Sequence, residues 1–276
     1  MASMPTASAE LATAEDWYVR RSPLNRCNLS PGAIASQAFQ AAPCALEIAW
    51  IRQENRAFFD LIATFEDAAE RGACFHEHVL SRYWMHEERT RWPTADERLS
   101  ASYVAVLRGW GVDSNGASGA VLKGWAEHRF GLRAIWHRTA LPRSDLAHER
   151  YASDLMRGVM AGIGMQLDLL YTYCQDELRR RHPGQRWLTL YRGTHDAEAY
   201  VVRRGNGREE LVEFNTVSSF TADREVAWAF GSRVWAVQVP LGKVVYFSAL
   251  LPRSLLLGEE EYIVLGGDHL VRSLVC

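Results

Sequence analysis

The period of the hydrophobic pattern changes near residue 185, and this change limits the possible fold more than any other feature of the chain. Before it, apolar residues recur at three- and four-residue steps, as on amphipathic helices. After it, they form short runs of the kind found in strands. Helices and strands are therefore segregated along the chain. This segregation predicts an α+β fold and argues against alternating β–α–β units.

Within the first part, helices are expected where the apolar spacing is regular. Residues 17–45 are punctuated by prolines and are expected to be irregular, whereas 46–91 predict helix. A turn at Asp113-Ser114-Asn115-Gly116 separates two shorter helices. Residues 145–181 predict the longest helix, stopped by Pro183-Gly184 after three arginines that complement the helix dipole. Three glycines inside that segment indicate close packing against a neighbour.

The last third predicts five strands and one helix. The helix is expected over 223–230, capped by Thr221 or Asp223. A turn is expected at Gly205-Asn206-Gly207. The strands are expected over 187–191, 210–217, 233–239, 244–247 and 262–265. We therefore expect a flexible tail over 1–16, a mainly helical region over 17–184 and a β-rich core over 185–276, integrated into one domain with the preceding helices.

Charge and cysteine content narrow the functional classes. The 31 basic and 33 acidic residues give a net charge of −2, so there is no basic excess for nucleic-acid binding. The five cysteines are odd in number and form no CxxC pair, which favours reduced thiols. No secretory signal is evident, and no apolar run approaches the ~20 residues that span a bilayer. We expect a cytoplasmic protein.

Three segments at strand ends carry the residues best suited to chemistry. Tyr191-Arg192-Gly193 offers a cation that can grip a phosphate, and Thr216–Phe220 offers hydroxyls that can orient a carboxylate. In Glu259-Glu260-Glu261-Tyr262, the first and third acids point the same way along a strand, about 6.6 Å apart. Each segment also has an ordinary explanation: a surface ion pair, helix capping, or a solvated strand start.

Taken together, the three segments resemble the Arg–Ser–Glu signature of the ADP-ribosyltransferases. The order matches, and so do the extended strings Ser219–Ala227 and Glu259–Ile263. The N-terminal string Asn25–Pro31 and the length resemble one family within that group, which modifies dinitrogenase reductase in nitrogen-fixing bacteria. The resemblance implies a C-terminal core of two short packed sheets with an NAD cleft. NAD would be consumed as a substrate.

The resemblance also implies roles for individual residues. Arg192 would hold a phosphate of NAD, the backbone of Gly193 would meet the nicotinamide amide, and Phe220 would lie near the nicotinamide. Glu261 would bond the ribose 2′-hydroxyl and stabilise the positive charge that develops as nicotinamide leaves. Glu259 would engage an acceptor arginine, since Glu-x-Glu accompanies arginine acceptors in this group.

The hydroxyl that orients Glu261 is left open by the alignment. If the middle motif of the signature is aligned on Phe214, its counterpart here is Thr216–Ser218. If it is aligned on the following helix, the counterpart is Val217–Ser219. Ser218 occurs in both and is the first choice, with Ser219 a second cofactor-binding candidate. The resemblance further implies that the acceptor is dinitrogenase reductase and that a PII-type signalling protein controls the enzyme, through the helical region. The segment 250–258 is expected to form part of the acceptor surface.

Two other functions are weighed from the same residues. A glycoside hydrolase could use Glu259 and Glu261, but such enzymes place their carboxyls on opposite sides of the scissile bond. A non-catalytic NAD-binding or protein-interaction module is the third possibility, because a fold does not guarantee activity. A metal site at Cys74, His76 and His78 is not predicted, since residues two apart on a helix point apart.

Overall fold

A computed structural model describes residues 25–83, 102–141, 146–158, 163–252 and 260–274. The described residues form helices in the N-terminal part and a six-stranded antiparallel sheet in the C-terminal part, so the α+β prediction is confirmed. The helices are α2 (Pro31–Ala35), α3 (Gln37–Ala41), α4 (Ile51–Glu54), α5 (Arg56–Ile62), α6 (Ala68–Arg82), α7 (Tyr103–Val112), α8 (Ala117–Phe130), α9 (Leu146–Gly158) and α10 (Ile163–Arg181).

The sheet is made of strands from the last third of the chain, with a small two-stranded pair before it. Its strands are β3 (Trp187–Thr194), β4 (Val201–Arg204), β5 (Glu209–Thr221), β6 (Arg233–Pro240), β7 (Val244–Phe247) and β8 (Glu261–Leu274). The small pair is β1 (Trp136–His137) and β2 (Thr139–Ala140). Short helices η2 (Ala197–Ala199), α11 (Arg224–Trp228), η3 (Leu241–Lys243) and η4 (Ser248–Leu250) connect the strands.

The strand order is β4-β5-β3-β6-β8-β7, with β5 also paired to β8. The two short sheets implied by the resemblance are therefore joined into one sheet that closes on itself through the β5–β8 pairing. Strands β3 and β5 share a single residue pair, Tyr191 opposite Thr221, whereas β3 and β6 pair along their whole length. Because β3 and β5 are otherwise unpaired, they separate beyond this point and leave room between them.

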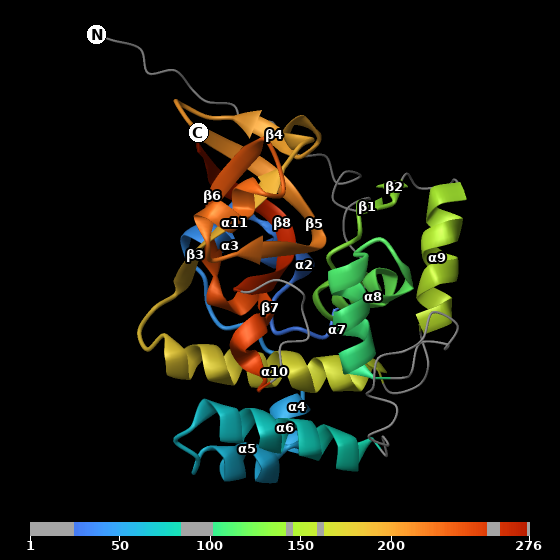
Figure 1. The fold of residues 1–276 in the computed structure, drawn as a ribbon, viewed down its shortest axis with the longest axis vertical. Coiled ribbons are helices and arrows are strands. Elements are labelled where there is room, and N and C mark those ends of the chain that lie inside the picture. The colour runs from blue at the N-terminus through green and yellow to red at the C-terminus, as the bar shows by residue number, and fades with distance from the viewer. Residues whose placement is uncertain (1–24, 84–101, 142–145, 159–162, 253–259, 275–276) are drawn as a thin grey trace.

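Helix α10 packs between the sheet and the helices α4–α6 (Figure 1). Its stripe of Ile163, Leu167, Leu170, Cys174 and Leu178 is buried, as the spacing predicts. Tyr171 Oη donates to the Gly242 carbonyl at 2.7 Å, and Gln175 Nε2 donates to the Val244 carbonyl at 2.7 Å. On its other side α10 contacts α4 and α6, while α7, α8 and α9 lie beside the sheet (Figure 1).

Several sequence expectations differ from the observed elements. The single helix expected over 145–181 is wrong: α9 and α10 run in clearly different directions (Figure 1). Of the three glycines expected inside one helix, Gly158 ends α9 and Gly164 lies in the first turn of α10, while Gly162 lies outside the described residues. Residues 31–41, expected to be irregular, form α2 and α3, because Ser30 and Ser36 cap them by accepting bonds from Ala33 and Phe39 N–H groups.

The strand predictions are largely confirmed, with longer bounds. Strand β7 matches its prediction over Val244–Phe247, while β5 and β8 extend well beyond theirs. Strand β4 was not predicted. Asp223 caps α11 by accepting from the N–H groups of Glu225 and Val226, which confirms one of the two expected caps.

A single cluster of buried apolar side chains runs through both parts of the chain. It includes Phe75 and Tyr173 from the helices and Leu190 and Val264 from the sheet. The division at residue 185 stays a prediction. Among the helices that the structure describes, none is long and apolar enough to cross a membrane.

Candidate active site

A cleft of about 670 Å³ lies where the end of α7 meets the sheet. Its walls come from six segments: the end of α7 and its following turn, the end of β3, the residues that flank η2, the end of β5, α11, and the start of β8. The cleft residues are Trp110–Ser114, Tyr191–Asp196, Tyr200, Ser219–Thr221, Val226, Ala227, Phe230 and Glu261. Five of the predicted site residues are thus brought together: Arg192, Gly193, Ser219, Phe220 and Glu261.

Arg192 is a half-buried cation held on aromatic rings. Its Nη1 donates to the Ser219 carbonyl at 2.6 Å, and its guanidinium carbon lies 5.8–6.0 Å from the ring centroids of Tyr200, Phe214 and Phe220. It forms no ion pair with any carboxylate among the residues that the structure describes, and its buried Nε has no hydrogen-bond partner there. A guanidinium with unused donors is suited to bind a phosphate.

Gly193 is required by the packing of α11. A Cβ built at this position would lie 1.9 Å from the Ala227 carbonyl oxygen. The glycine therefore allows the backbone of α11 to approach the end of β3, which places Val226 and Ala227 in the cleft wall. The expected contact of the Gly193 backbone with a ligand stays a prediction.

The β5–β8 register decides which polar side chains share a face. Thr221 lies directly opposite Glu261, and Ser219 lies directly opposite Ile263. Because side chains alternate along a strand and opposite residues share a face, Ser219, Thr221 and Glu261 point to the same side. All three border the cleft. The structure therefore groups two hydroxyls and one carboxylate at the cleft, with Glu261 half-buried.

Ser218, the first choice from the sequence, lies on the opposite face of β5. It is 4% exposed, is paired opposite Val264 of β8 and does not border the cleft. Thr216 lies at a bulge in β5 and is 2% exposed, and its buried Oγ1 has no partner among the described atoms. This geometry does not support Ser218 as the hydroxyl that orients Glu261. Ser219, one residue further along the strand, borders the cleft instead, because a one-residue step along a strand reverses the side-chain direction. Which hydroxyl orients Glu261 stays a prediction.

Phe220 is 3% exposed and lines the cleft from β5. Its ring packs edge-on against Phe214 at 5.1 Å between centroids and lies beneath Arg192. In this structure Phe220 supports the arginine. Glu259 and most of the 250–258 segment lie outside the described residues.

The sequence did not point to the wall contributed by α7. Trp110 Nε1 donates to Ser219 Oγ at 3.0 Å, across 109 residues of sequence. The following turn places Asp113 and Ser114 at the same cleft. The turn itself was predicted, but no sequence signal connects it to β5.

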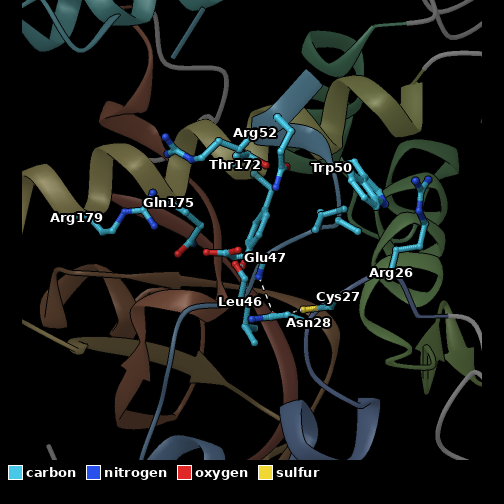
Figure 2. A pocket seen from close by; sticks show the side chains of 14 residues that line it. Arg26, Cys27, Asn28, Leu46, Glu47, Trp50, Arg52, Thr172, Gln175 and Arg179 are labelled. Atoms are coloured by element: carbon cyan, nitrogen blue, oxygen red, sulfur yellow. Dashed lines mark hydrogen bonds between the residues drawn. The ribbon is translucent and has the colours of Figure 1, made fainter. Parts of the chain in front are cut away.

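A second, smaller pocket of about 200 Å³ lies between α4, α10 and the segment around Cys27 (Figure 2). Arginines 26, 52 and 179 and the exposed Trp50 surround it. Asp176 pairs with both Arg52 and Arg179, and Glu47 lines the pocket, so part of this positive charge is neutralised. None of the predicted site residues lies here.

The histidines near Cys74 have other partners. His76 Nδ1 is 2.7 Å from Tyr103 Oη, and His78 Nε2 is 3.1 Å from Asn55 Oδ1, while its ring stacks on Phe58. Across the described ranges, no group of three or more His, Cys, Asp or Glu side chains could hold a metal ion.

The fold and the cleft together define an α+β protein whose site combines an unpaired arginine, aromatic rings, hydroxyls and a carboxylate, as a dinucleotide-binding site requires. The family model described as dinitrogenase reductase ADP-ribosyltransferase (DRAT) matches residues 24–273. The curated NAD(+)--dinitrogen-reductase ADP-D-ribosyltransferase of Rhodospirillum rubrum is 37% identical over 258 residues, which cover 90% of this chain and 94% of that protein. No solved structure matches the chain. The chain belongs to the dinitrogenase reductase ADP-ribosyltransferase family.

Proposed function

We propose that this chain transfers ADP-ribose from NAD to an arginine of dinitrogenase reductase and thereby inactivates it. The Rhodospirillum rubrum relative carries that substrate pair in its name, and the similarity covers nearly the whole of both proteins. The observation that carries the proposal in this chain is the meeting of Arg192 and Glu261 in one cleft. Arg192, near the end of β3, supplies a cation without an ion pair in the described structure. Glu261, at the start of β8, supplies a carboxylate.

In the proposed reaction, the bond between ribose C1′ and the nicotinamide nitrogen breaks, and nicotinamide leaves with the bonding electron pair. Arg192 binds a phosphate of NAD and so fixes the dinucleotide. Glu261 bonds the ribose 2′-hydroxyl and stabilises the positive charge that develops on the sugar. A guanidinium nitrogen of the acceptor then bonds to C1′ and loses a proton, for which Glu259 is the proposed base.

The hydroxyls next to Glu261 complete the proposed site. Ser219 faces the cleft beside Glu261 and is proposed to orient its carboxylate, in place of Ser218. Phe220 holds Arg192 in position by packing beneath the guanidinium. The glycoside-hydrolase and non-catalytic alternatives have no support from the relatives or from the cleft.

The proposal is tested with NAD labelled on the adenylate phosphate. Incubation with purified dinitrogenase reductase is expected to place label on the reductase, at an arginine identified by mass spectrometry. Glu261→Gln keeps the side-chain size and removes the charge, so it should lower the transfer rate by at least about 100-fold. Glu225→Gln, an exposed residue of α11 outside the cleft, is the matched control and should act like the unmodified chain.

Full transfer activity in Glu261→Gln would contradict the proposed role of this carboxylate. Release of nicotinamide without label on the reductase would keep NAD cleavage and reject the acceptor. The family resemblance also supports control by a PII-type signalling protein that docks on the helical part. A pull-down with no association in any nucleotide state would count against that control.

A further inference from the structure

We propose that Trp110 is a positioning residue, which fixes the direction of the Ser219 hydroxyl and so organises the cleft around Glu261. The proposal rests on the proposed function and deepens it. It assigns part of the catalytic geometry to the helical region, which the Arg–Ser–Glu segments do not include. The evidence is a single well-formed hydrogen bond and the register of the strands that surround it.

The bond between Trp110 and Ser219 can have only one polarity. An indole Nε1 is a donor and never an acceptor, whereas a serine hydroxyl can do either. At 3.0 Å, Trp110 Nε1 therefore donates to Ser219 Oγ. The hydroxyl hydrogen of Ser219 is then directed away from the indole and is available to an acceptor in the cleft.

The acceptor that the register offers is the carboxylate of Glu261. Ser219 shares a face of the sheet with Glu261, which is diagonal to it across the β5–β8 pair. Diagonal neighbours are about 7–8 Å apart, a span that a glutamate side chain or a bound hydroxyl can bridge. With its oxygen occupied by Trp110, Ser219 acts as a donor toward negative charge, as the orientation of a catalytic carboxylate requires.

Trp110 itself is held rigidly. It is 4% exposed and lies near the end of α7, which Ser102 caps by accepting from Ala105 N–H at 3.1 Å. A Cβ at Gly109 would lie 2.1 Å from Ser118 Oγ, so α7 and α8 are in close contact at this point. A side chain on a packed helix holds its geometry better than one on a loop.

A buried cation, Lys123, lies near the indole. Lys123 Nζ is 6.0 Å from the Trp110 ring centroid and 3.2 Å from Asn115 Oδ1 in the turn that borders the cleft. Burial lowers the pKa of Lys123 to about 8. Trp110 thus connects the polar contacts of the α7–α8 turn to the hydroxyl on β5. A displacement of α7 would therefore change the hydrogen bond to Ser219.

The test uses Trp110→Phe, which keeps an aromatic ring and removes the N–H donor. Its matched control is Trp187→Phe, which removes an indole N–H that donates to the Gln40 carbonyl at 2.7 Å, outside the cleft. Nicotinamide release and transfer to the reductase are measured at several NAD concentrations. We expect kcat of Trp110→Phe to fall about 5- to 10-fold, as for loss of one hydrogen bond of about 1 kcal/mol, with little change in the KM for NAD. Trp187→Phe should leave both kcat and the KM for NAD unchanged.

A double-mutant cycle separates positioning from packing. In a Ser219→Ala background, Trp110→Phe should lower kcat by less than about twofold, since the bond is already lost. An equal loss in both backgrounds, or unchanged kcat in Trp110→Phe, would overturn the proposal. If Trp110→Phe does not fold, as judged by thermal denaturation, Trp110→Leu takes its place in the same cycle. If the unmodified chain cleaves no NAD, both the proposed function and this inference are overturned. If the chain is active but kcat shows no coupling between Trp110→Phe and Ser219→Ala, this inference alone is overturned.

Discussion

At the scale of single residues, the cleft depends on which way each side chain points. Arg192 is oriented by one bond to a backbone carbonyl and by three aromatic rings, so its remaining donors are kept for a ligand. Glu261 and Ser219 share a face because β5 and β8 are paired in a defined register. A shift of this register by one residue would turn Ser218 toward the cleft and Ser219 away from it.

The two adjacent serines give a direct test of the register. Ser219→Ala removes the cleft hydroxyl and is expected to lower kcat about 10-fold, with NAD binding nearly unchanged. Ser218→Ala changes a buried hydroxyl on the other face and should leave kcat within about twofold. Steady-state nicotinamide release measures both. The reverse order of effects would show that Ser218 is the orienting hydroxyl and that the assignment to Ser219 is wrong.

At the scale of elements, α6 and α10 are joined by a buried ion pair. Arg71 Nε and Nη2 donate to the two carboxylate oxygens of Glu177 at 2.5 and 2.9 Å, and the side chains are 6% and 0% exposed. Arg71 Nη1 also donates to the carbonyls of Phe65 and Glu66, which close the loop before α6. The hydrogen bond to Glu177 raises the pKa of Arg71, so its guanidinium stays charged.

Removal of one partner should therefore be costly. Arg71→Met leaves the Glu177 carboxylate buried without its main cation and is expected to lower the free energy of unfolding by about 3–5 kcal/mol. Arg56→Met is the matched control, because the Arg56–Asp60 pair at 3.6 Å is 84% and 70% exposed and contributes little. Urea denaturation compares the two. A loss for Arg71→Met no greater than that for the control would contradict the structural role of the pair.

The elements also show how far the sequence allows prediction. Strand β7 and the capped helix α11 were predicted because their signals are local: a short apolar run in the first case, and an aspartate before a helical pattern in the second. The break between α9 and α10 was missed, since the apolar stripe continues across it. Strand β4 was missed because Val201–Arg204 lacks a clear alternation and is stabilised by its pairing with β5.

The site was predictable where a family motif exists and not where the contact is purely three-dimensional. Arg192, Gly193, Phe220 and Glu261 were expected together and line one cleft. The choice between Ser218 and Ser219 depends on the register of β5, which no local signal determines. Trp110 could not be predicted at all, because its bond to Ser219 joins residues 109 positions apart.

At the scale of the whole molecule, the buried lysine Lys243 is expected to make stability depend on pH. Its Nζ donates to the Gly266 carbonyl at 2.9 Å, with His269 Nε2 at 3.4 Å and the charge of Asp268 nearby. Burial lowers its pKa from 10.5 to about 7, and burial also lowers the pKa of His269. The folded protein thus holds Lys243 uncharged at alkaline pH.

The sign of this effect follows from proton uptake. Between about pH 7 and 10.5 the unfolded chain keeps a proton that the folded protein lacks, so the Lys243 contribution makes the free energy of unfolding rise with pH. Below pH 7 the contribution is constant. Lys243→Met should reduce the slope by up to about 1.4 kcal/mol per pH unit in that window. Chemical denaturation at a series of pH values measures it, and an unchanged slope would contradict a depressed pKa.

The most direct test of the central claim is a crystal structure of the Glu261→Gln variant with NAD. We expect the dinucleotide in the cleft between β3, β5 and the end of α7, with a phosphate on Arg192 and the nicotinamide ribose beside residue 261 and Ser219. NAD in the pocket near Trp50 and Arg179 (Figure 2), or in the cleft without contact to Arg192 and residue 261, would contradict it.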